Sequence, residues 1–471
     1  MSKEHFYVCI FMKDGVPTGH ATSEANNFEI IETELSDEEV PTVSGFGEQF
    51  HLFQKAILSY MELLPVVASL LPTVSRGVQN SIGGEFLESH GTEILSAEDR
   101  KIFELPIGHR HEWAALNEQL AASSLVGKQV PKMLLIGIVS TFEHFQSRLF
   151  SEILKCKPQK YLLDDRTVTL ADVTKYGSID ELKKNILERD VENIMRESFV
   201  NQIEKIESLL EIKNPIPPSY KDWNDLVEIF ERRNLFAHAD GRVNEIYLGR
   251  LKKERITSTA KSGDELVVKP AYLNRALMLI CEFGTMSYQV AWRRCCPNEV
   301  AAADEALGEL GYNLIERGHL SAAERILRFA KSLRGRDTSE QTLSDTINLA
   351  NCYRLQKKKS ECEAELALQN WKVLGPEFQI CVASINGDIT EVVRLMKVLY
   401  ASKADFPIDN YERWAAFYGT RDHDDFKKAF KRMFGRDYIP APSLKSAVTY
   451  IAKAKKQAAK EEQQASDSTR H

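Results

Sequence analysis

Between about residues 108 and 296, apolar residues recur at the spacing of an α-helix, and prolines or polar turns separate the helical stretches. A chain with this pattern has to bury one face of each helix against other helices. The pattern predicts five helices, with a short β-hairpin around Gly263 in residues 252–270. Their expected ranges are 111–124, 132–157 (opened by Pro131 and closed by Pro158), 179–210, 219–241 and 271–294. We therefore expect a mainly α protein with a helical domain over residues 108–296.

The first 95 residues have a different pattern, which predicts a small α+β region of unknown role. Residues His5–Met12 and Asn27–Leu35 have the composition of strands, and residues 36–47 form an acidic loop. A helix is expected over Gln49–Leu71 with a break near Pro65, followed by a boundary at Ser75–Gly84.

Small and apolar residues predict paired helices over residues 300–435. The first copy of the pattern is the clearest, the second is weaker around Leu349–Leu366, and a third centres on Asn386–Asp388. The first copy consists of Leu310, Gly311, Leu314, Gly318, Ala323, Leu327 and Ala330. This spacing resembles the tetratricopeptide (TPR) repeat, in which small residues lie where two helices cross. The resemblance implies a TPR-like α-solenoid and, by analogy, a surface for a protein trigger or regulator. Residues 447–471 start helical, turn polar and are expected to be partly disordered.

Composition limits the classes of function. The chain has a net charge of -7, so nucleic-acid binding would have to come from a local basic patch. No CxxC pair occurs among Cys9, Cys156, Cys281, Cys295, Cys296, Cys352, Cys362 and Cys381, which predicts buried free thiols in a reducing compartment. The N-terminus lacks the apolar core of a signal peptide, and Ala56–Leu71 is too short to span a bilayer. We expect a cytoplasmic protein that does not contact membrane.

The helix predicted over residues 219–241 carries the chemistry. Ser219 and Asp222 are expected to cap its start, and Trp223, Leu226, Val227 and Phe230 form an apolar stripe. One turn further, the stripe meets the polar residues Arg233, Asn234 and His238. Polar groups on a packing face need partners, so this interruption indicates a site or an interface.

Helix geometry restricts how these residues can act together. Asn234 and His238 are neighbours on one face, whereas Arg233 lies about 140° around the helix from His238. Two explanations remain open. Either the helix distorts near its end, or a second copy of the chain completes the site.

The residue types suit cleavage of an RNA phosphodiester without a cofactor. His238 lies near the negative end of the helix dipole and is suited to general acid and base catalysis, while Arg233 can bind phosphate through its planar donors. Residues 249–261 carry five cations against Glu254 alone. With Arg232, the candidate RNA-binding residues are Arg250, Lys252, Lys253 and Arg255.

Arg233-Asn-Leu-Phe-Ala-His238 resembles the RNxxxH motif of the HEPN family, and residues 130–295 resemble its context. The resemblance implies a helical bundle that dimerises through its motif helices and cleaves RNA without metal, as in toxin, abortive-infection and other antiviral systems. It implies that Arg233 and His238 are the catalytic pair and that Asn234 supports them. Glu143, in an apolar helix containing Ser140-Thr-Phe-Glu-His-Phe145, is a candidate supporting residue.

Two interpretations remain from the sequence. One is a homodimeric endoribonuclease kept inactive until a trigger arrives, and a smaller, related possibility is a HEPN toxin controlled by a nucleotidyltransferase encoded beside it. The other is a non-catalytic HEPN and TPR scaffold that recruits a protein or nucleic-acid partner. In that case Arg233 and His238 would only make hydrogen bonds across an interface.

Overall fold

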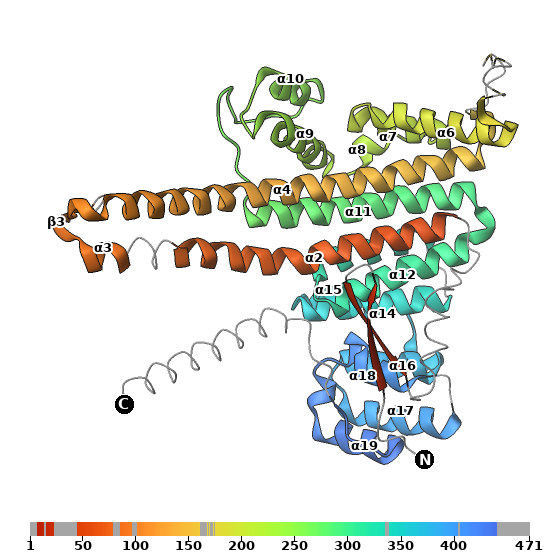
Figure 1. The fold of residues 1–471 in the computed structure, drawn as a ribbon. Coiled ribbons are helices and arrows are strands. Elements are labelled where there is room, and N and C mark those ends of the chain that lie inside the picture. Colours follow the sequence, from red (N-terminus) through yellow and green to blue (C-terminus); the bar gives the residue numbers. More distant parts are fainter. Residues whose placement is uncertain are drawn as a thin grey trace, which may run out of the picture. The chain divides into compact units, whose positions relative to one another are not determined.

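The protein is mainly helical, as predicted (Figure 1). The computed structural model describes residues 7–13, 16–22, 45–78, 85–96, 101–160, 167, 169, 173, 175–334, 339–403 and 406–439. The chain divides into two compact units. The larger contains residues 49–337, and the smaller combines residues 1–48 with 338–441. The predicted tail at 447–471 and the predicted strand Asn27–Leu35 lie outside the described residues.

Three long helices form the centre of the larger unit: α2 (Gly45–Val78), α4 (Arg110–Cys156) and α11 (Pro270–Cys295). Stacked rings join them, with Phe53 of α2 3.9 Å from Phe145 of α4, and Phe145 4.8 Å from Tyr288 of α11 (centroid distances). Gly284 lets the Phe53 ring of α2 pack directly against the backbone of α11, because a Cβ on this residue would lie 2.5 Å from Cζ of Phe53. Figure 1 shows α11 beside the C-terminal half of α4.

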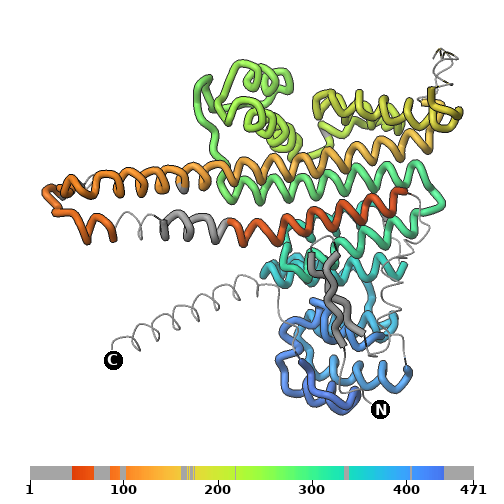
Figure 2. The backbone as a smooth tube through the Cα atoms, in the orientation of Figure 1, coloured from red at the N-terminus to blue at the C-terminus, as the bar shows by residue number. Residues whose placement is uncertain are grey.

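Two prolines predicted to interrupt helices lie inside them. α4 runs through Pro131, so the predicted helices 111–124 and 132–157 are one helix, traced without a break in Figure 2. An interior proline costs about 3 kcal/mol. Leu135, Ile138 and Val139, in the next turns, are fully buried and contribute about 1.5–3 kcal/mol each, which exceeds that cost. The predicted break at Pro65 is wrong for the same reason, because the buried face of Phe53, Ile57 and Leu64 keeps α2 helical.

The remaining predicted helices of this unit need smaller corrections. The stretch 179–210 is two helices, α6 (Ile179–Met195) and α7 (Phe199–Leu210), because the Ser198 side chain accepts a hydrogen bond from the Asn201 backbone and caps α7. The motif helix is α9 (Trp223–Ala239), preceded by the short α8 (Ile216–Ser219). The predicted capping by Ser219 is wrong, since its hydroxyl donates to the Pro215 carbonyl.

The predicted hairpin at 252–270 is absent from the described residues. Residues Glu245–Lys253 form helix α10, and the segment after it pairs with the end of α9 instead of with itself. Leu266 N donates to the Gly241 carbonyl at 2.9 Å, and Val243 N donates to the Asp264 carbonyl at 2.9 Å. The turn at Gly263, with φ of 93°, therefore returns the chain to α9.

The first predicted helical pair is α12 (Val300–Glu316) and α13 (Leu320–Arg334). A Cβ on Gly311 would lie 2.6 Å from Cδ2 of Leu327, so the small residue is required where the two helices cross. Arg325 of α13 forms ion pairs with Asp222, at the start of α9, and Glu282 of α11. This pair is therefore joined to the bundle within the larger unit.

The smaller unit contains the other predicted pairs, α14 (Glu340–Leu355) with α15 (Lys359–Leu366), and α16 (Pro376–Ile385) with α17 (Ile389–Ser402). Helices α18 (Ile408–Arg413) and α19 (Asp424–Phe434) follow. Strand β1 (Tyr7–Lys13) agrees with the sequence prediction. Its antiparallel partner β2 (Val16–Thr22) was not predicted.

In the larger unit, helix α3 (Glu85–His90) and the strands β3 (Thr92–Ser96) and β4 (Lys101–Glu104) connect α2 to α4 and were not predicted. The described stretch Ile107–Cys156 is long and apolar enough to cross a membrane by length and composition alone. A core helix passes the same test, and the second half of α4 is lined with buried residues. Of the seven cysteines whose burial the structure describes, four are buried, whereas Cys156 is exposed and Cys295 and Cys296 are half-buried.

Candidate active site

The apolar stripe of α9 packs as predicted and ends where its partner helix begins. Trp223 and Phe230 stack on Phe199, the first residue of α7, with ring centroids 5.5 and 3.9 Å away. The next turn of the stripe carries Asn234 and His238, which lie past the N-terminus of α7. Side chains in that turn therefore face an opening instead of another helix.

That opening is a groove of about 440 Å³, which we call the motif groove. It brings together six of the residues that the sequence singled out, from three helices. Glu143 comes from α4. Arg233, Asn234 and His238 come from α9, and Arg250 and Lys253 come from α10.

Arg233 and Glu143 form an ion pair at one side of the motif groove. The side chains are 16% and 28% exposed, so the pair is largely shielded from water. Burial lowers the pKa of Arg233, but a guanidinium remains charged in proteins. Its Nε is buried and has no hydrogen-bond partner among the described residues. Arg233 is thus a fixed cation with donor capacity left over.

Asn234 and His238 also line the motif groove. Asn234 is half-buried and His238 is exposed, in the last turn of α9. Neither side chain has a hydrogen bond or ion pair with the part of the chain that the structure describes. An amide and an imidazole one helical turn apart are therefore free to meet a ligand.

The groove extends around α9 far enough to include Arg233. At about 100° per residue, its residues on this helix span roughly 160°, from Arg233 at one edge to Glu231 at the other. α9 stays helical to Ala239, so no distortion is needed for Arg233 and His238 to line one groove. They approach it from different directions, with Asn234 between them.

The end of α9 is held in place from α4. Nζ of Lys132, which is 5% exposed, donates to the Asp240 carbonyl at 2.9 Å and to its carboxylate at 3.1 Å. Hydrogen bonds from Gln129 and Lys132 lower the pKa of Asp240. Gly241 has φ of 86°, and a Cβ there would lie 2.7 Å from the Phe236 ring. These contacts fix the turn that carries His238.

The predicted RNA-binding cations separate into two groups. Arg250 lines the motif groove and pairs with Glu231 at 3.1 Å, and Lys253 lines it without an ion-pair partner among the described residues. Lys252 and Arg255 are exposed outside it. Arg232 is not part of the groove lining either.

Arg232 has a structural environment of its own. It pairs with Glu228 at 2.6 Å and lies over the Tyr272 ring at 4.3 Å. The hydroxyls of Tyr247 and Tyr272 donate to the same Glu228 carboxylate at 2.8 and 2.7 Å. This cluster joins α9, α10 and α11, and it engages the Nε donor and one face of the Arg232 guanidinium.

Sequence reasoning missed the turn between α6 and α7. Arg196 and residues Ser198–Gln202 line the motif groove opposite α9. Gln202 Nε2 holds this turn by donating to the carbonyls of Met195 and Glu197, at 3.1 and 2.9 Å. The first turn of α7 faces the groove, and N–H groups at a helix start favour anions. Ser198, as an N-cap, was the one signal available, and the apolar periodicity across it concealed the break.

The lining contains four arginines and lysines (Arg196, Arg233, Arg250 and Lys253) and four glutamates (Glu143, Glu197, Glu231 and Glu254). The groove is therefore not a general basic surface. It suits a ligand held at a few points, such as one phosphate between Arg233, Lys253 and the start of α7.

No protein-family model, no curated protein and no solved structure matches this chain.

Proposed function

We propose that the protein is a metal-independent endoribonuclease that cleaves RNA at the motif groove. The observation that carries this proposal is the grouping of Arg233, Asn234 and His238 in one groove, with the imidazole and the amide unpartnered. The likeness of Arg233–His238 to the HEPN motif gives the substrate class, because many members of that family cleave RNA.

The proposed reaction is an internal transesterification. The 2′-hydroxyl of the ribose loses its proton to a neutral His238 and attacks the adjacent phosphorus. The bond from phosphorus to the 5′-oxygen of the next nucleotide breaks, and that oxygen takes up a proton from an imidazolium. The products are a 2′,3′-cyclic phosphate and a 5′-hydroxyl. No electron is transferred and no water is consumed.

Arg233 supplies the charge that the pentacoordinate phosphorus centre needs. A guanidinium fixed before the reaction stabilises developing negative charge without reorganising. Glu143 acts through Arg233 as a positioning residue, because its carboxylate holds the guanidinium at the groove. Asn234 lies between Arg233 and His238 and would orient the ribose or the phosphate.

We further propose that the active form is a homodimer joined through the motif helices. In an in-line displacement the attacking and leaving oxygens lie on opposite sides of phosphorus. One imidazole at one edge of a groove can exchange a proton with one of these oxygens, and His238 of a second copy would exchange a proton with the other.

The role of such an enzyme would be that of a regulated toxin or antiviral effector, with the helical pairs after residue 300 binding the trigger.

The test in cells uses wild type and the His238→Ala and Arg233→Ala variants, expressed in a bacterial host with and without phage infection. We expect wild type to slow growth and fragment RNA under at least one of these conditions, while both variants leave RNA intact. Growth curves and RNA electrophoresis measure this, and immunoblots confirm equal protein levels. Intact RNA with wild type under every condition would favour the non-catalytic scaffold instead. Fragmentation of RNA by both variants would show that Arg233 and His238 are not the site.

A further inference from the structure

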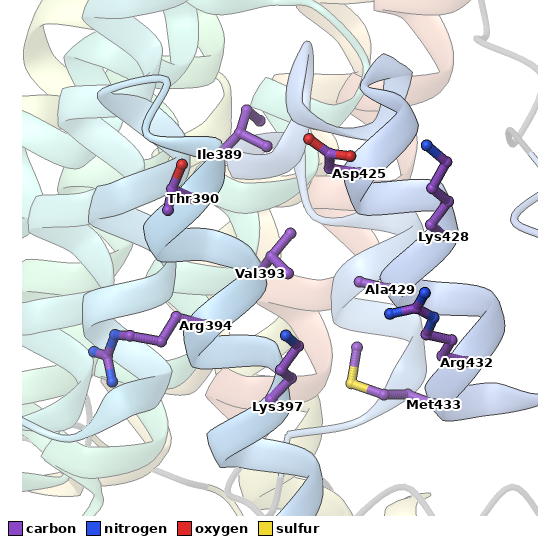
Figure 3. A pocket seen from close by; sticks show the side chains of 10 residues that line it. All are labelled: Ile389, Thr390, Val393, Arg394, Lys397, Asp425, Lys428, Ala429, Arg432 and Met433. Atoms are coloured by element: carbon purple, nitrogen blue, oxygen red, sulfur yellow. The ribbon is translucent and has the colours of Figure 1, made fainter.

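A second groove lies in the smaller unit, between α17 and α19, away from any residue assigned above. Its volume is about 520 Å³. The floor is aliphatic, formed by Ile389 and Val393 of α17 and by Ala429 and Met433 of α19. Figure 3 shows these side chains between the two helices. We call this feature the α17–α19 groove.

The walls of the α17–α19 groove are basic. Arg394 and Lys397 come from α17, Lys428 and Arg432 come from α19, and Asp425 is the one acid in the lining. Arg394 is neutralised by Glu391, with two contacts of 2.7 Å, and Figure 3 shows its side chain turned away from the groove.

The other three cations are free. Lys397, Lys428 and Arg432 are exposed, and none has a hydrogen bond or ion pair with the described part of the chain. Three unpaired positive charges from two helices thus surround an aliphatic floor. Like charges around one groove repel each other, so an anionic ligand would relieve an unfavourable arrangement.

The lining favours an acidic peptide over a nucleic acid. Single-stranded nucleic acids are usually held by aromatic rings that stack on the bases, and no aromatic residue is among the ten that line this groove. Aliphatic side chains flanked by cations instead match a peptide that alternates apolar and acidic residues.

The chain itself contains such a segment. Residues 23–44 hold seven acids (Glu24, Glu29, Glu32, Glu34, Asp37, Glu38 and Glu39) and no lysine or arginine. Phe28, Ile30, Ile31 and Leu35 are interspersed among these acids. The segment lies outside the described residues, and it belongs to the same unit as the groove.

The segment is attached at both ends, to β2 at Thr22 and to α2 at Gly45. Its apolar side chains lie in residues 28–35, which are six residues from Thr22 and ten from Gly45, and these stretches reach roughly 20 Å and roughly 35 Å when extended. The unit has about 150 residues, for which a radius of gyration of about 15 Å is typical.

We propose that the acidic segment 24–40 docks in the α17–α19 groove, with its carboxylates on Lys397, Lys428 and Arg432 and its apolar side chains on the aliphatic floor. This inference does not depend on ribonuclease activity.

The test is a competition between the chain's own segment and an added copy of it. The probe is a fluorescent synthetic peptide of residues 24–43, measured by anisotropy against the full chain. Peptide binding is measured with two full chains. One is wild type, and in the other the seven acids of residues 23–44 are replaced by Asn or Gln, so that the chain's own segment no longer competes with the peptide. The groove variant K397E/K428E/R432E and its neutral counterpart K397Q/K428Q/R432Q are made in the second chain. The matched control K372E/K403E/K427E changes exposed lysines of the same unit outside the groove.

We expect the acid-neutralised chain to bind the peptide about tenfold more tightly than wild type. The groove variant should lose about tenfold or more, the glutamine variant should lose an intermediate amount, and the control should change little. Binding should weaken with added salt. Circular dichroism melts establish that every variant is folded. Equal binding by the groove variant and its control would overturn the proposal. The proposal would also be overturned if the groove variant lost binding of a single-stranded RNA oligonucleotide and not of the peptide.

Discussion

Replacing His238 by alanine is expected to lower the rate of RNA cleavage by about 10²- to 10⁴-fold, the usual contribution of a general acid or base. The reason is that His238 is the unpartnered imidazole in the motif groove, at the end of a helix fixed by Lys132 and Gly241. The measurement is the single-turnover cleavage rate of a labelled RNA by the purified chain with its activating condition present. Because the side chain is exposed, the free energy of unfolding should change by less than about 0.5 kcal/mol.

A matched control separates catalysis from charge and fold. Lys252→Ala removes a cation from α10 that does not line the motif groove, so the rate should stay within about threefold of wild type, as for a single exposed contact. Arg233→Ala should fall as steeply as His238→Ala, while Arg233→Lys should recover only part of the loss, because lysine lacks the planar fork of donors. A His238→Ala enzyme with the wild-type rate would exclude the imidazole from the reaction.

Replacing Phe142 by alanine is expected to lower the free energy of unfolding of the larger unit by about 3–5 kcal/mol. Phe142 is 2% exposed, and its ring contacts four others from four helices, at centroid distances of 5.5 to 6.4 Å. The partner rings are Phe145 of α4, Phe199 of α7, Phe230 of α9 and Phe283 of α11. Removing it leaves a cavity at the point where the elements around the motif groove meet.

Hydrogen exchange with mass spectrometry measures this loss locally, through peptides of α4, α7 and α9. Phe142→Leu, which keeps most of the volume, should cost less than Phe142→Ala. His144→Ala, two positions away on the exposed side of α4, should change protection little. Equal protection in Phe142→Ala and His144→Ala would show that these helices are not held together through this ring.

Much of the helical organisation could be predicted from the sequence, because amphipathic periodicity is a local signal. α9, α11 and the pairs from α12 to α17 lie close to where the apolar and small residues placed them. The errors came from local signals that tertiary packing overrides. Pro65 and Pro131 indicate helix ends, yet both lie inside long helices whose apolar faces are buried. The reverse error occurred at Ser198, where continuous periodicity concealed a break.

Six residues that the sequence singled out line one groove, but the geometry of that groove was not predicted. The motif and Glu143 were identified from residue types, and the groove brings them together. The angle between Arg233 and His238 around the helix predicted that the two side chains would not face one site. That angle does not include the width of the opening between the neighbouring helices, which is large enough for both residues to line it. The turn at Arg196–Ser198 and the engagement of Arg232 with Glu228 depend on contacts between distant segments, which one sequence does not reveal.

The most direct measurement is the chemistry of the RNA ends that the purified chain produces in the presence of EDTA. The proposed mechanism predicts a 2′,3′-cyclic phosphate on one fragment and a 5′-hydroxyl on the other, with both ends absent for His238→Ala. Fragments with a 5′-phosphate and a 3′-hydroxyl, or cleavage abolished by EDTA and restored by a divalent cation, would contradict it. In either case the motif groove would not work through the 2′-hydroxyl and the histidine.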